Sequence, residues 1–188
     1  MTNTIYLETP VPFHVLFTCP HCHAVRQVPE QYVGQTGQCN TCGGAITIKA
    51  SDLPSAPTTP HPKAWYRERM LYFEFCRDNY ERARSEFPPI PNDEYWQHQI
   101  QIAANCHDRL EQVARWERLV AQGIPWPVAY EYLVHHYVKD KDYERAFYFC
   151  SVYFHSDRWK NPQCAGSSYK LLKTMRKLDK KLHPEYES

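Results

Sequence analysis

The sequence predicts a mainly α-helical protein, with a small β mini-domain at the N-terminus followed by an all-α bundle. Residues 1–52 hold most of the glycines and short runs of alternating apolar residues, which are typical of short strands. A proline-rich stretch follows at 53–61. Between 62 and 188, apolar residues recur at three- and four-residue steps, the spacing of helices that are buried along one face.

The N-terminal mini-domain carries two C-x-x-C pairs separated by sixteen residues. The pairs are Cys19 with Cys22 and Cys39 with Cys42, and Pro20 and Gly43 favour tight turns there. Two thiolates on one such turn can reach a metal ion from one side, and a second turn completes a tetrahedral sulfur shell. The spacing therefore predicts one metal ion held by these four cysteines.

A structural zinc ion is the expected occupant, because a domain of about 50 residues buries too little apolar surface to fold without such support. Four thiolates also leave no open position for catalysis. Rubredoxin-type iron sites use the same ligands, so sequence alone leaves zinc and iron open. A thioredoxin-like redox role is the remaining alternative, but neither pair lies in a βαβ pattern.

The segment FTCPHCHAVRQVPEQYVGQTGQCNTCGGAITI resembles the short zinc ribbons found at the N-termini of bacterial and phage proteins. Those ribbons have an aromatic residue before CPxC, a Val-Pro step, a Gly-x-x-G turn and a CxxCG turn. The chain departs from the pattern at His23, where a glycine is frequent. The resemblance implies zinc and a ribbon fold, but no particular activity.

The helical part should contain about five helices. Pro62 suits the first turn of the first helix and Asn92 suits the N-cap of the second. We expect helices over 62–86, 92–121, 127–139, 142–155 and 167–182. The prolines of 53–61 predict a stiff, extended linker between ribbon and bundle.

Residues 130–153 are similar to one tetratricopeptide unit. Tyr130, Leu133 and Tyr137 take the expected places on its first helix and Ala146 on its second. The resemblance implies a helix hairpin, and an ordinary antiparallel pair is the alternative. Because the sequence contains no convincing second copy, a stack of repeats is not expected.

The charge of the whole chain does not favour nucleic acid as a partner, because 22 Lys and Arg are balanced by 21 Asp and Glu. The last 30 residues are an exception, with seven basic and three acidic residues. This basic segment could contact nucleic acid or an acidic partner. The alternative is that it forms the solvated face of a helix, which would give the same pattern. The residues concerned are Lys170, Lys173, Arg176, Lys177, Lys180 and Lys181.

No sequence motif indicates catalysis, so we expect no enzyme, no catalytic residue and no small-molecule substrate. We also expect no membrane contact and no secretory signal, hence a cytoplasmic protein in which the other four cysteines are reduced. The leading hypothesis is a non-enzymatic, zinc-binding adaptor whose helical domain binds a protein partner. A nucleic-acid-associated factor is the alternative, and a helical-domain enzyme is the least favoured.

Overall fold

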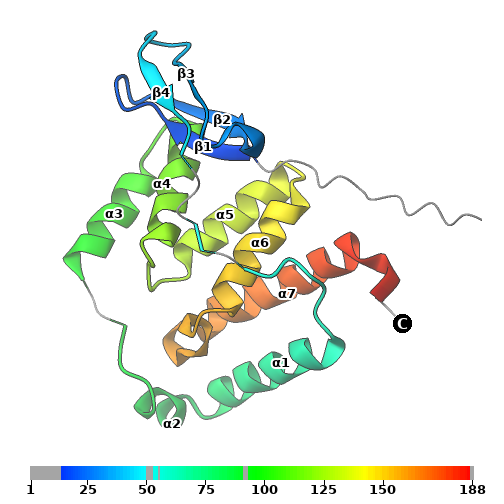
Figure 1. The fold of residues 1–188 in the computed structure, drawn as a ribbon. Coiled ribbons are helices and arrows are strands. Elements are labelled where there is room, and N and C mark those ends of the chain that lie inside the picture. Colours follow the sequence, from blue (N-terminus) through cyan, green and yellow to red (C-terminus); the bar gives the residue numbers. More distant parts are fainter. Residues whose placement is uncertain (1–13, 50–52, 55, 91–92, 187–188) are drawn as a thin grey trace, which may run out of the picture. The chain divides into compact units, whose positions relative to one another are not determined.

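The computed structural model describes residues 14–49, 53–54, 56–90 and 93–186. The chain divides into two compact units, residues 1–51 and 52–188 (Figure 1). The expected N-cap at Asn92 lies outside the described residues.

The N-terminal unit consists of two antiparallel β-hairpins. Strand β1 (His14–Thr18) pairs with β2 (Val25–Pro29), and β3 (Thr36–Gln38) pairs with β4 (Ala45–Thr47). A short 3-10 turn, Glu30–Tyr32, follows β2. The chain then turns at Gly34, whose φ of 84° is one that glycine adopts without strain. The buried apolar residues described here are few: Cys19, Val25, Cys39 and Ile48.

The C-terminal unit contains seven α-helices among its described residues, where about five were expected. They are α1 (Lys63–Asp78), α2 (Tyr80–Ser85), α3 (Glu94–Ala104), α4 (Arg109–Ala121), α5 (Val128–Lys139), α6 (Tyr143–Phe154) and α7 (Ala165–Leu182). Short 3-10 turns occupy Arg158–Lys160, Pro162–Cys164 and Pro184–Tyr186.

Two of the expected helices are each divided in two. The helix expected over 62–86 breaks at Asn79, which has φ −131° and ψ 42°. The helix expected over 92–121 is interrupted after Ala104, because the Asp108 side chain accepts the Glu111 N–H and starts a new helix. Asp93 caps α3 in the same way, by accepting the Tyr95 N–H.

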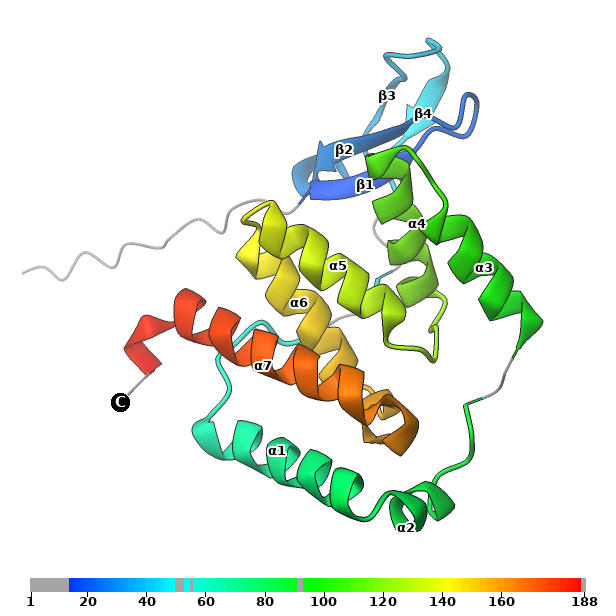
Figure 2. The ribbon, with the colours of Figure 1, turned by 180° about the vertical axis from the view of Figure 1, so that it is seen from behind.

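Helix α6 lies at the centre of this unit. It packs on α5 and α7, and α7 in turn packs on α1 (Figures 1 and 2). Because α6 has neighbours on several sides, Phe147, Phe149, Cys150, Tyr153 and Phe154 are all 2% exposed or less. Burial on all sides explains why α6 carries few charges.

The described residues of the proline-rich segment belong to the C-terminal unit and pack on its helices. The Tyr148 hydroxyl donates to the Pro54 carbonyl over 2.5 Å, and the Ser151 hydroxyl donates to the Pro57 carbonyl. Further along, the His61 backbone N–H donates to Asp179 Oδ2 at 3.0 Å. Proline lacks an N–H but keeps a carbonyl acceptor, so this segment can be held by side chains of α6.

Candidate metal centre

The four predicted cysteine ligands converge at the hairpin turns of the N-terminal unit. Cys19 and Cys22 lie between β1 and β2, and Cys39 and Cys42 lie between β3 and β4. The Sγ atoms of Cys19 and Cys42 are 3.8 Å apart, as are those of Cys22 and Cys39. All four sulfurs lie within 4.8 Å of one another.

These distances fit a tetrahedral ion such as zinc. A Zn–S bond of about 2.3 Å places the corners of a tetrahedral sulfur shell about 3.8 Å apart. A disulfide would require about 2.05 Å between sulfurs, and all eight cysteines are free. The site is therefore a four-sulfur cluster that could bind a metal ion, with every ligand position filled by protein.

The two cysteine turns share one hydrogen-bond pattern. Cys19 donates its N–H to the Ala24 carbonyl and accepts the His23 N–H, each at 3.0 Å. Cys39 does the same with Gly44 and Gly43, at 2.9 and 2.7 Å. The same backbone turn therefore presents both pairs of sulfurs.

The backbone also favours thiolate at this site. Hydrogen bonds from the backbone at Thr41 and Cys42 lower the pKa of Cys39 to about 6. At Cys42, a backbone hydrogen bond from Gly44 favours the thiolate, but burial and the three other sulfurs oppose it and raise its pKa to about 11. The Cys39 thiol therefore ionises at a lower pH than the Cys42 thiol. Such a separation is expected when several anions share a small space.

Side chains outside the sulfur cluster tie the first hairpin to the second. His21 Nε2 donates to the Ala45 carbonyl at 2.9 Å, and its ring lies against Gly44. Arg26 Nη2 donates to Thr41 Oγ1 at 2.7 Å. His21 and His23 are both exposed, but His21 also holds the two cysteine turns together. The long-range Ala45 contact could not be inferred from the sequence.

The remaining cysteines have a different environment. Cys76, Cys150 and Cys164 are buried in the helical unit, and burial raises the pKa of each thiol, to about 11 for Cys164. Cys106 is half-buried. Buried thiols with raised pKa values are poor nucleophiles, so burial in the packed helical unit accounts for Cys76, Cys150 and Cys164.

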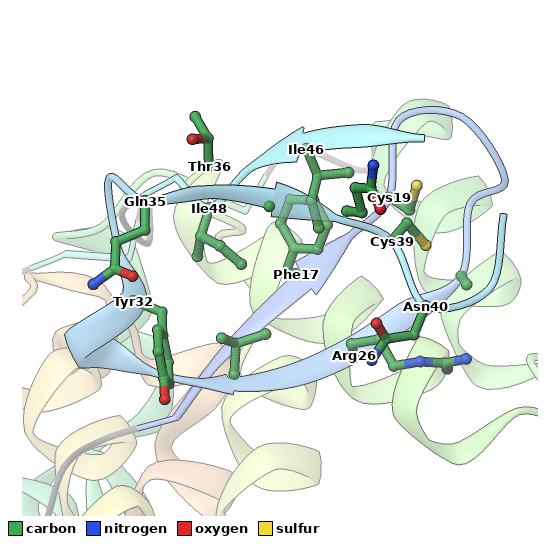
Figure 3. A pocket seen from close by; sticks show the side chains of 14 residues that line it. Phe17, Cys19, Arg26, Tyr32, Gln35, Thr36, Cys39, Asn40, Ile46 and Ile48 are labelled. Carbon is green, nitrogen blue, oxygen red and sulfur yellow. The ribbon is translucent and has the colours of Figure 1, made fainter. Parts of the chain in front are cut away.

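An open hollow of about 440 Å³ lies within the N-terminal unit (Figure 3). Strands β1, β2 and β4, together with the residues next to them, contribute alternate residues to its lining, among them Phe17, Val28, Ile46 and Ile48. By contrast, the segment around β3 contributes six consecutive residues, 35–40. Since successive side chains of a strand point to opposite faces, such continuous lining means that β3 meets the hollow along its edge.

The six predicted basic contact residues lie on α7, and all six are exposed. They belong to the helical unit and take no part in the sulfur cluster.

Comparison with protein-family models, curated proteins and solved structures finds no match for this chain. Among the described residues, no helix combines the length and apolar character that a membrane crossing requires.

Proposed function

We propose that the chain is a non-enzymatic adaptor in which a structural zinc ion holds a small ribbon together and the protein binds other proteins. The four thiolates complete a tetrahedral shell, so the ion would contribute folding energy rather than a reactive position. Within this proposal, Cys19, Cys22, Cys39 and Cys42 hold the ion, while His21 and Arg26 brace the turns that present the sulfurs.

The hollow of the ribbon is the observation that carries the binding role. Its floor is apolar, and β3 borders it with an edge that pairs with no other strand among the described residues. Cys39 donates its N–H across to Gly44, so by alternation the N–H groups of Thr36 and Gln38 point away from β4. An extended peptide could pair with this edge and place alternate side chains on Phe17 and Ile46.

The helical unit would supply a second surface. Leu71 and Phe75 lie one turn apart on α1 and are 55% and 38% exposed. In the α5–α6 hairpin, the four positions that match a tetratricopeptide unit are buried, which supports the proposed likeness to that scaffold. They are Tyr130, Leu133, Tyr137 and Ala146.

A proline exchange on the β3 edge tests the ribbon surface. Gln38→Pro removes an N–H that faces the hollow, while leaving the N–H of Cys39 that bonds to Gly44. Thr47→Pro is the matched control. Ile48 donates to Gln35, so by alternation the Thr47 N–H points to the outer edge of β4, away from the hollow.

The full-length wild type and both variants are immobilised and exposed to extract from the native host, after equal metal content has been verified. The adaptor function predicts a protein partner that wild type and Thr47→Pro retain and Gln38→Pro loses. Recovery of no specific partner contradicts the adaptor function. Equal recovery by all three proteins contradicts the role of the β3 edge.

A further inference from the structure

The exposed face of α7 has an unusual charge distribution. Its six Lys and Arg residues are all exposed, whereas the only acid of this helix, Asp179, is 6% exposed. At 100° per residue, the six cations fall within an arc of about 140°, and Lys170 and Lys181 are about 16 Å apart along the axis. Buried Leu171, Leu172 and Met175 occupy the opposite side.

Asp179 does not neutralise this face, because its carboxylate is bonded on the inner side. Asp179 Oδ2 accepts the Tyr66 hydroxyl at 2.6 Å and the His61 N–H, and Oδ1 pairs with His183 Nδ1 at 2.9 Å. The chain as a whole is nearly neutral, with a formal charge of +1. Net positive charge is therefore concentrated on the exposed side of α7.

We propose that this face of α7 binds the phosphate backbone of duplex DNA without reading its sequence. Cations that recur every three or four residues along a helix are about 4.5 to 6 Å apart, close enough to neutralise successive phosphates of one strand. The only aromatic residue of α7 is Tyr169, which is half-buried and has Lys173 Nζ 5.2 Å from its ring centroid, so the face lacks the series of aromatic platforms on which successive bases of single strands stack.

A lipid surface fits this helix less well. Interfacial helices insert an apolar face into the membrane, but the apolar face of α7 is already buried against α6 and α1. The side of α7 that remains exposed carries the six cations. The binding inferred here is thus electrostatic, and it is independent of the adaptor role of the ribbon.

Salt dependence measures this interaction directly. Fluorescence anisotropy with labelled duplex DNA of mixed sequence is recorded on the full-length protein between about 50 and 200 mM salt. If all six cations neutralise phosphates, the slope of log K against log salt should be about −5. Single-stranded DNA, duplex RNA and polyglutamate serve as competitors.

The variant Lys170→Gln/Lys177→Gln removes two cations from the face. Its slope should become less steep by about 2, with weaker binding at every salt concentration. The matched control, Arg82→Gln/Arg84→Gln, removes two exposed cations from α2 and should bind as wild type does.

Preferential competition by duplex DNA, together with loss in the α7 variant alone, supports the proposal. No binding at micromolar protein in low salt, a flat salt response, or equal loss in both variants overturns it. Stronger competition by polyglutamate would instead assign the face to an acidic protein. Stronger competition by single-stranded DNA or duplex RNA would likewise reject duplex DNA as the ligand.

Discussion

His23 and Gly43 occupy the same place in the two cysteine turns, and both have positive φ angles, 59° and 72°. Each donates its backbone N–H to the first cysteine of its turn. A left-handed backbone costs a non-glycine residue about 1 kcal/mol or more, whereas glycine adopts it freely. The first turn therefore carries a local strain that the second avoids.

Two separate substitutions, one at Gly43 and one at His23, should change the stability of the ribbon in opposite directions. Gly43→Ala should destabilise it by about 1 kcal/mol for conformational reasons alone, since a Cβ at Gly43 would meet nothing within 4 Å. His23→Gly should stabilise it by up to about 1 kcal/mol. Competition with a metal chelator, followed as metal release from the full-length protein, measures both changes. Equal effects of the same sign would contradict the equivalence of the two turns.

Gly44 is required for a different reason. A Cβ at this position would lie 2.6 Å from His21 Cδ2, so Gly44→Ala should displace the imidazole and break its hydrogen bond to the Ala45 carbonyl. We expect a loss of about 1 kcal/mol of ribbon stability. The double variant His21→Ala/Gly44→Ala should be no less stable than His21→Ala, because the clash is then absent. Additive losses in the chelator assay would show that His21 is not the cause.

The helical unit should lose stability on acidification because of His61. Burial lowers the pKa of His61 to about 4 from 6.5, Asp179 opposes this shift, and His155, Arg69 and His183 add to it. The unfolded chain therefore binds a proton near pH 6.5 that the folded protein does not take up until about pH 4. Stability should fall as pH falls through that window.

The variant His61→Phe isolates this contribution. Urea unfolding of wild type and variant at several pH values between 7 and 4.5 should show a smaller loss of stability for the variant. Every other side chain is the same in both proteins, so the difference reports on His61. Parallel pH curves would contradict the assignment.

The sequence predicted the sulfur cluster well because its geometry is local. Each C-x-x-C pair forms its own turn, and one contact between two hairpins is enough to bring four sulfurs together. The departure at His23 was also visible in the sequence. The sequence did not show that His23 has a left-handed backbone conformation, which is unfavourable for a residue with a side chain. That finding required the backbone φ angle.

The helical unit was predicted less completely. Asp108 and Glu111 form a recognisable start signal for α4, yet the apolar spacing alone suggested one continuous helix. The bond from Tyr148 to Pro54 joins residues 94 positions apart, so no local pattern could show that the proline-rich segment packs on α6. Similarly, the burial of Asp179 depends on Tyr66, 113 positions away in the sequence.

The most direct measurement of the central claim is native mass spectrometry of the full-length protein combined with elemental analysis. We predict one zinc ion per chain, and loss of that ion in Cys22→Ser and Cys39→Ser but not in the control Cys106→Ser. Chelation should unfold the ribbon and leave the far-ultraviolet helical signal almost unchanged, because the ligands lie outside the helical unit. A protein without bound metal, or one whose four ribbon cysteines are joined as disulfides, would contradict the account.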